Sequence, residues 1–261
     1  NIGLILPMLM AKLLGKRTVL VLTGLYSKNA EAFYKDSLRD RILLWALKRL
    51  EGVSLALSDL IISYTDNTIA EFNLNKYKDK ISGNGARFVD TTLFKVTRNL
   101  DERKNVIGYI GRFRGEKGTL DFANAIPLLL EEHPDIEFSM VGDGPLFDKV
   151  ERKIGNYRPG AISLTRWIPH DEVPEYLNGL KLLVIPSYSE TGPYIALEAM
   201  ACGTPVLSTP LGFIPDIIED GSTGFILQDN SPESIARNVV RALVHADLAQ
   251  VASRARSLVE Q

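Results

Sequence analysis

The sequence predicts a doubly wound α/β fold divided into two domains, and three observations lead to this prediction. Short apolar runs alternate with helical patterns from Thr18 onward. Many of these runs are continuously apolar, which is typical of parallel strands covered on both faces of a sheet. The alternation is interrupted once, by the polar and irregular residues 84–104. Alternating strands and helices favour a parallel α/β sheet, and a single interruption favours two such units.

Eight segments have the apolar composition of strands and eight have the periodicity of helices. The expected strands are Thr18–Thr23, Leu60–Tyr64, Val106–Gly111, Glu137–Gly142, Ile162–Trp167, Leu180–Pro186, Pro205–Ser208 and Gly224–Leu227. The expected helices are Leu38–Leu50, Asp66–Asn73, Gly118–Glu132, Gly144–Gly155, Asp171–Leu177, Pro193–Cys202, Ile214–Glu219 and Pro232–His245.

The domain boundaries follow from this pattern. We expect a partial N-terminal domain over residues 1–88, a linker over 89–104 and a nearly complete C-terminal domain over 105–261. Only two or three strands precede the linker, whereas a doubly wound domain normally has at least five. The remaining strands of the first domain are therefore expected outside this sequence.

Composition excludes several classes of protein. The chain has 261 residues, of which 45% are hydrophobic and 24% charged, and its net charge is -2. This is ordinary for a globular protein and shows no basic excess for nucleic-acid binding. Cys202, the single cysteine, is expected to be a small packed side chain. The apolar residues 1–14 are too short for a membrane span and suggest a buried helix, with a membrane-surface helix as the alternative.

The segment from Glu190 to Val206 places two carboxylates near one expected strand end. Glu190 follows a strand, Pro193 suits the first turn of the next helix, and Glu198 lies further along that helix. Ligands of open α/β sheets bind outside such strand ends. Glu190 and Glu198 could accept hydrogen bonds from sugar hydroxyls, and the N–H groups near Gly192 and Tyr194 favour oxygen-rich groups. Alternatively, Glu190 caps the helix and Glu198 is solvated.

A second loop, residues 111–118, combines glycines with basic side chains after another expected strand. Gly111 and Gly118 permit close approach of backbone to an anion. Arg112 offers a forked donor and Lys117 a point charge, which together suit a diphosphate. A surface turn with solvated charges is the alternative. The role of Arg114 stays open.

Three further features carry weaker signals. Gly142 and Gly144 form a tight turn that either shapes the loop or contacts a ligand. The spacing lacks the third glycine of a nicotinamide-binding fingerprint. Trp167 and Ile168 lie in a strand-end loop that either reads a base or packs in the core. The three histidines, His133, His170 and His245, have no metal-ligand spacing and are expected to have ordinary structural roles.

These motifs together resemble the family 4 (group 1) retaining glycosyltransferases of GT-B fold. The resemblance is carried by the two glutamates eight residues apart before Ala-Met-Ala-Cys-Gly-Thr-Pro-Val, and by the Gly-Arg-x4-Lys-Gly loop. It implies one nearly complete Rossmann-like domain plus a truncated second one. It further implies that Asp90 positions the linker, and that the family's Gly-rich loop and histidine across the cleft are not in this sequence.

The resemblance assigns roles to the candidate residues. It implies that Arg112, Lys117 and Glu190 act in catalysis, the first two by neutralising the departing nucleotide diphosphate. Glu198 would hold the ribose, and the remaining donor contacts would be Gly111, Gly142, Gly144, Trp167, Ile168, Thr191, Gly192, Pro193 and Tyr194. Basic side chains would replace a metal ion, so no cofactor is expected.

The implied reaction is sugar transfer from a nucleotide-sugar, UDP- or GDP-linked, to the hydroxyl of a glycan or lipid-linked acceptor with retention of configuration. Front-face attack is implied, because no residue is placed as a nucleophile. The expected location is cytoplasmic, with peripheral contact at the inner membrane face left open. A GT-B epimerase and a non-catalytic nucleotide-sugar-binding fragment are the alternatives. Donor, acceptor and oligomeric state are not specified by the sequence.

Overall fold

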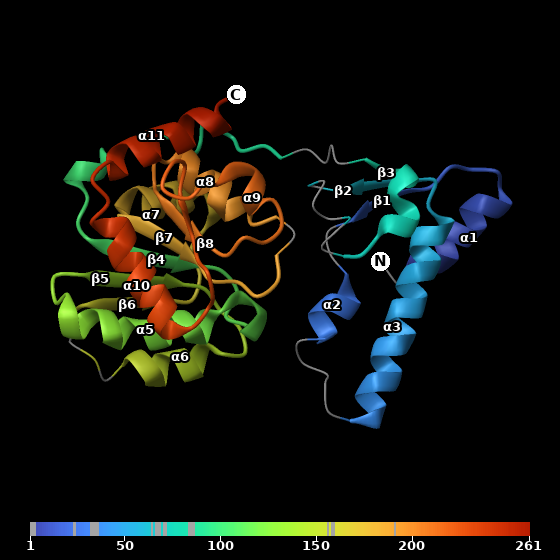
Figure 1. Cartoon of the computed structure of the whole chain (residues 1–261), viewed down its shortest axis with the longest axis horizontal. Coiled ribbons are helices and arrows are strands. Elements are labelled where there is room, and N and C mark those ends of the chain that lie inside the picture. The colour runs from blue at the N-terminus through green and yellow to red at the C-terminus, as the bar shows by residue number, and fades with distance from the viewer. Residues whose placement is uncertain are drawn as a thin grey trace. The chain divides into compact units, whose positions relative to one another are not determined.

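The computed structural model describes residues 4–22, 25–31, 37–63, 65, 69, 72–82, 87–155, 157, 160–190 and 192–261. The chain divides into two compact units. The first comprises Asn1–Arg87 together with Glu190–Gly192, and the second comprises Phe88–Ser189 and Pro193–Gln261. Each unit has its own sheet and core (Figure 1).

The first unit is a small parallel sheet with helices. Its elements are α1 (Ile5–Leu13), β1 (Val19–Leu22), α2 (Tyr26–Glu31), α3 (Leu38–Leu57), β2 (Leu60–Ser63), the 3₁₀-helix Asn75–Lys80 and β3 (Ile81–Ser82). In its described part the sheet has the order β1-β2-β3, with Val19 beside Leu60 and Ile61 beside Ile81. A core of Leu20, Leu22, Leu55, Ile61 and neighbouring apolar side chains holds it together.

The helix α3 begins at a capping box. The Ser37 hydroxyl accepts a hydrogen bond from the Asp40 amide at 3.1 Å, and the Asp40 carboxylate accepts one from the Ser37 amide at 3.3 Å. These reciprocal bonds satisfy amide groups that have no partner within the helix. The helix ends at Leu57, seven residues beyond the predicted Leu50.

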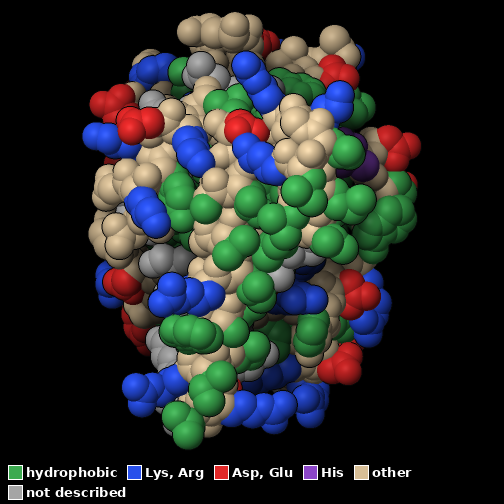
Figure 2. All heavy atoms as spheres, turned by 90° about the vertical axis from the view of Figure 1, so that its right-hand side faces the viewer, with side chains coloured by type: hydrophobic (Ala, Val, Ile, Leu, Met, Phe, Trp, Pro, Cys, Tyr) green, Lys and Arg blue, Asp and Glu red, His purple; other side chains and the backbone are tan. Residues whose placement is uncertain are grey.

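The expectation of a buried N-terminal helix is wrong. A helix forms, but Met8 is its single buried residue in the described part, and most of its other apolar side chains are exposed. Leu13 is 86% exposed. Apolar composition alone predicted burial. Among the described residues, however, α1 is covered only on the side of Met8. Figure 2, which faces the first unit, shows hydrophobic side chains at the surface on this side of the molecule.

The second unit is a six-stranded parallel sheet, counted over its described residues, with the order β6-β5-β4-β7-β8-β9. The strands are β4 (Val106–Ile110), β5 (Glu137–Val141), β6 (Ile162–Thr165), β7 (Leu182–Ile185), β8 (Val206–Ser208) and β9 (Phe225–Ile226). Each coincides with a predicted strand. β7 and β8 are buried at every residue, which explains why their sequences are continuously apolar.

Helices cover both faces of this sheet, as Figure 1 shows. They are α5 (Thr119–Glu132), α6 (Phe147–Ile154), α7 (Val173–Gly179), α8 (Tyr194–Ala201), α9 (Ile214–Ile217), α10 (Pro232–Leu243) and α11 (Leu248–Val259). One core cluster includes side chains of α5, α6 and α10. The other includes side chains of α7, α8 and α9. The sheet therefore lies between two helical layers, which is the doubly wound arrangement.

Not every element was predicted. The helices α2 and α11 and the two-residue strand β3 had no counterpart in the sequence analysis. Most of the expected helix Asp66–Asn73 lies outside the described residues. The other predicted helices are present; apart from the longer α3, their ends differ from the predicted ones by at most three residues.

The predicted linker packs as part of the second unit. Phe94 is 2% exposed within the cluster formed by α7, α8 and α9. Arg103 is buried as well, and its guanidinium donates to the carbonyl oxygens of Arg98 at 2.9 Å, Cys202 at 2.8 Å and Leu180 at 3.1 Å. These contacts tie the segment to the ends of α7 and α8.

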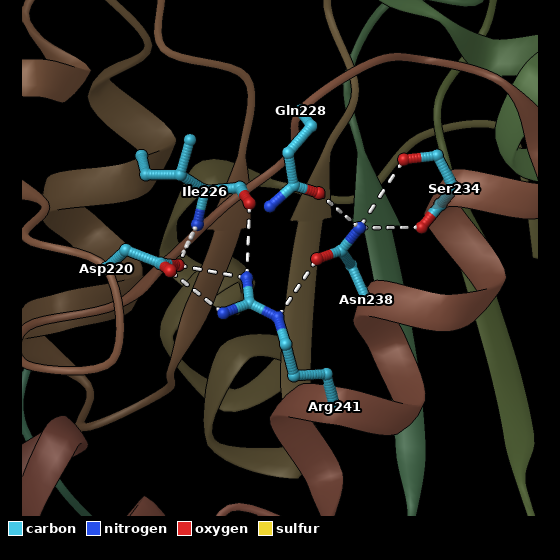
Figure 3. Close-up of polar contacts among 6 residues, drawn as sticks. All are labelled: Asp220, Ile226, Gln228, Ser234, Asn238 and Arg241. Carbon is cyan, nitrogen blue, oxygen red and sulfur yellow. Dashed lines mark hydrogen bonds and ion pairs between the residues drawn. The ribbon is translucent and has the colours of Figure 1, made fainter.

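A polar network joins β9 to α10 (Figure 3). Arg241 forms a two-pronged ion pair with Asp220, both distances being 2.9 Å, and also donates to Asn238 at 3.0 Å. Burial raises the pKa of Asp220, but hydrogen bonds from Arg241 and from the Ile226 amide outweigh it, so the pKa lies below its ordinary value. The network fixes the edge of the sheet furthest from β6.

Candidate functional site

The order of the strands places a topological switch between β4 and β7. The chain runs outward from β4 to β5 and β6, and then returns to place β7 on the other side of β4. All six strands in the described part of this sheet are parallel, so their carboxyl ends lie at one edge. Open α/β sheets bind ligands in the crevice at such a switch.

The loop after β4 carries the predicted basic residues. Arg112 is exposed and Lys117 is half-buried at the end of a 3₁₀ turn, Gly115–Lys117. Gly118 has φ +64°, and a Cβ there would lie 1.9 Å from the carbonyl oxygen of Pro186. Only glycine combines this left-handed backbone with such a close approach to the end of β7.

The loop after β5 interlocks with this basic loop. The Phe113 amide donates to the Asp143 carbonyl at 2.8 Å, and the Leu146 amide donates to the Phe113 carbonyl at 3.2 Å. A Cβ on Gly142 would lie 1.8 Å from the Gly111 carbonyl oxygen, and φ at Gly142 is +155°. Loop packing therefore accounts for this glycine, and a direct ligand contact by Gly142 or Gly144 stays a prediction.

The loop after β7 is joined to the same basic loop. The Tyr188 amide donates to the Glu116 carbonyl at 2.8 Å. Further along, the predicted residues Glu190 and Gly192 are half-buried and belong to the first compact unit. Thr191 lies outside the described residues. The roles predicted for these three residues stay predictions.

The second predicted carboxylate, Glu198, lies in α8. Pro193 is buried at the N-cap and Tyr194 is the first residue of the helix, so Glu198 comes about one turn later. Its side chain is 18% exposed, which excludes the solvated-surface alternative. Burial raises the pKa of the Glu198 carboxyl, and a hydrogen bond with His170 lowers it in part.

His170 is the residue that sequence reasoning assigned to an ordinary role. Its Nε2 lies 3.3 Å from Glu198 Oε1, and its ring meets Phe94 edge-on at a centroid distance of 5.5 Å. The side chain is mostly exposed, so one edge of the ring remains open to solvent. The only sequence signal for this position was its place in the loop after β6, next to α7.

The loop after β6 holds the predicted base-reading residues. Trp167 is 73% exposed and Ile168 packs against the core cluster of α7, α8 and α9. Arg166, which the sequence analysis did not select, donates to Asp143 at 2.9 Å and lies 3.6 Å above the Phe147 ring. Arg166 thus cross-links the loops after β5 and β6.

Four loops therefore meet at one edge of the second unit. They combine exposed or half-buried cations after β4, a partly buried carboxylate in α8 and an exposed indole after β6. This defines a doubly wound α/β protein whose strand-end loops suit an anionic, hydroxyl-rich ligand.

The chain belongs to the family described as glycosyl transferases group 1, whose model matches residues 90–256. Among similar curated proteins, an uncharacterized glycosyltransferase of Methanocaldococcus jannaschii is 29% identical over 142 residues, covering 54% of this chain and 38% of that protein. The 2-deoxystreptamine glucosyltransferase of Streptomyces kanamyceticus is 26% identical over 204 residues, covering 76% of this chain and 53% of that protein. The chain thus spans about half or less of these relatives.

Solved structures confirm the fold class. A crystal structure of Anabaena HepE in complex with UDP and glucose matches 100% of this chain and 72% of that chain, with a TM-score of 0.78 at 17% identity. The C-terminal domain of a group 1 glycosyl transferase from Francisella tularensis matches 66% of this chain and 96% of that one, with a TM-score of 0.59 at 28% identity. The expected GT-B type α/β fold is therefore confirmed.

Proposed function

We propose that this chain supplies the donor-binding part of a retaining glycosyltransferase, which moves a sugar from a nucleotide-sugar to an acceptor hydroxyl. The observation that carries the proposal is that a basic loop and a partly buried carboxylate lie at the same carboxyl edge of one parallel sheet. The family membership and the HepE complex with UDP and glucose support the same class of donor.

The diphosphate would bind at the loop after β4. Arg112 and Lys117 offset the charge that builds on the leaving diphosphate, so the proposal needs no metal ion for this task. The glycines of the interlocked loops let backbone N–H groups approach phosphate oxygens. Gly118 and Gly142 let these loops pack closely against their neighbours, which favours a diphosphate-binding loop that is already in place.

The nucleoside would extend from the diphosphate toward α8 and the loop after β6. The Glu198 carboxylate accepts hydrogen bonds from the ribose hydroxyls, and His170 orients it. The backbone of Trp167 and Ile168 reads the edge of the base. Glu190, with the neighbouring backbone of residues 191–194, holds the sugar.

The acceptor, the stereochemistry and the cellular site are parts of the same proposal. We assign the acceptor to a glycan or a lipid-linked molecule and the reaction to the cytoplasm. In the described residues no helix is long and apolar enough to cross a bilayer. Retention by front-face attack predicts that the product keeps the anomeric configuration of the donor, which NMR coupling constants report.

Calorimetric titration with UDP, GDP and ADP tests the donor site and identifies the base. Arg112→Ala or Lys117→Ala should weaken binding of the preferred diphosphate at least about tenfold, because each removes a charged donor. Arg152→Ala is the matched control, since Arg152 is an exposed arginine on α6 outside the candidate loops. Unchanged affinity in both loop variants, measured on folded protein, would remove the diphosphate assignment.

A further inference from the structure

A column of stacked planar side chains runs through the loops of the candidate site. Phe113, in the basic loop after β4, is fully buried. Its ring stacks on the ring of Phe147, the first residue of α6, with a centroid distance of 5.7 Å and an interplanar angle of 17°. The guanidinium carbon of Arg166, in the loop after β6, lies 3.6 Å from the centre of the Phe147 ring. The column therefore joins the loop proposed to bind the diphosphate to the loop proposed to read the base.

The edge of the Arg166 guanidinium is held as well as one of its faces. Its Nη1 donates to Asp143 Oδ1 at 2.9 Å, and its Nη2 lies 3.5 Å from Asp148 Oδ1. The Asp143 carboxylate is itself fixed, because the same oxygen accepts a hydrogen bond from the Gly144 amide at 2.8 Å. Phe147 thus supports the guanidinium from one side, and two carboxylates orient it in its own plane.

The opposite face of this guanidinium is open. The Arg166 side chain is 55% exposed although Phe147 and two carboxylates contact it. Because a guanidinium is planar, a ring on one face and carboxylates at the edge leave the second face to solvent. Arg166 therefore presents a flat cationic surface at the carboxyl edge of the sheet, directly before Trp167 in the chain.

Two simpler roles account less well for this arrangement. The carboxylates that pair with Arg166 are 56% and 81% exposed, and exposed ion pairs add little to stability. A phosphate would need a pair of N–H groups at the edge of the guanidinium, where both terminal nitrogens already face carboxylates. The group that remains available is the flat face, which suits a planar ligand.

We propose that the nucleobase of the donor stacks on the open face of Arg166. Guanidinium planes stack on unpaired bases, and the positive charge is attracted to the π face of the ring. The inference rests on the proposed function and adds the group that holds the flat face of the base, while the backbone after β6 reads its edge. Stacking accepts any base, so Arg166 favours a nucleoside diphosphate over a base-free diphosphate without selecting between bases.

Calorimetric titration with a nucleotide and with a base-free ligand tests the inference. Arg166→Ala should weaken binding of the preferred nucleoside diphosphate about tenfold and leave the affinity for inorganic pyrophosphate unchanged. Arg166→Lys keeps the charge but loses the plane, so it should bind the nucleotide as weakly as the alanine variant does. Arg152→Ala is the matched control, because Arg152 is an exposed arginine on the neighbouring helix α6. It should keep the parental affinity for both ligands.

Nuclear Overhauser contacts give a second readout that does not depend on affinity. In arginine-labelled protein saturated with the nucleotide, protons of the base should contact the Cδ protons of one arginine, and this signal should be missing in Arg166→Lys.

The other outcomes would overturn the inference in distinguishable ways. Equal loss of nucleotide and pyrophosphate binding in Arg166→Ala would mean that Arg166 acts only by positioning the loops. Full recovery in Arg166→Lys would mean that its charge matters and its plane does not. A parent protein that binds neither ligand would overturn the proposed donor site itself, whereas unchanged nucleotide affinity in Arg166→Ala would overturn only the stacking.

Discussion

Replacing Arg103 by alanine should destabilise the second unit strongly. Arg103 is 4% exposed, and its guanidinium donates to the backbone carbonyls of Arg98, Leu177, Leu180 and Cys202 and to the Thr204 hydroxyl at 2.7 Å. Burial lowers the pKa of Arg103 to about 10, so the side chain stays charged at neutral pH. It is an internal cation satisfied mainly by carbonyl dipoles.

The size of the effect follows from the acceptors that alanine would leave behind. Within the described residues, the carbonyl oxygens of Arg98 and Cys202 accept hydrogen bonds from Arg103 alone. The buried Cys202 acceptor left without a donor costs about 2 kcal/mol and the part-buried Arg98 acceptor about 1 kcal/mol, so the loss is about 3 kcal/mol. For a domain of this size that corresponds to a fall of about 10 °C in Tm. Lysine cannot replace the planar guanidinium of Arg103, because a single ammonium group does not reach all of these acceptors.

Urea unfolding measures this loss. In a Trp45→Phe background the remaining Trp167 reports on the second unit, and far-UV circular dichroism follows the whole chain. Arg98→Ala is the matched control, since it removes an exposed side chain and keeps the carbonyl group. A change below about 1 kcal/mol in Arg103→Ala, similar to that of the control, would show that water or rearranged side chains replace the guanidinium.

Two further substitutions test the geometry of the candidate site. Burial raises the pKa of Glu198, so the folded chain holds the carboxyl proton more tightly than the unfolded chain does. Stability therefore falls as pH rises from the pKa of the unfolded chain, near 4.5, through the higher pKa of the folded chain. Glu198→Gln should therefore add about 1 kcal/mol of stability at neutral pH and little near pH 4, and it should weaken nucleotide binding. Thermal melts that show equal gains in stability at both pH values would contradict the pH dependence. Gly142→Ala puts a Cβ 1.8 Å from the Gly111 carbonyl oxygen, so it should lower the free energy of unfolding by about 2 kcal/mol and weaken nucleotide binding. Gly179→Ala is the control, because its Cβ meets open space and should change neither property. Equal melting temperatures for these two alanine variants would mean that the loops are not interlocked.

The sequence determined the fold class and the strands of the second unit. Continuous apolar runs such as Leu182–Ile185 have one stable environment, the interior of a parallel sheet covered on both sides, so composition was enough. The candidate loops were likewise predictable, because glycine and proline limit the backbone locally and because each loop follows a strand. The family 4 resemblance, carried by the motifs at 111–118 and 190–206, agrees with the matched family.

Only the tertiary structure decided which side chains meet. His170 and Glu198 are 28 residues apart along the chain, and their 3.3 Å contact depends on how the loop after β6 packs beside α8. The packing of Phe94 and Arg103 on the second unit, and the exposure of α1, depend in the same way on long-range contacts. Local composition specifies which elements form and where ligands can bind between them. It does not specify which neighbours cover an element, because burial is a property of the assembled layers and not of the segment.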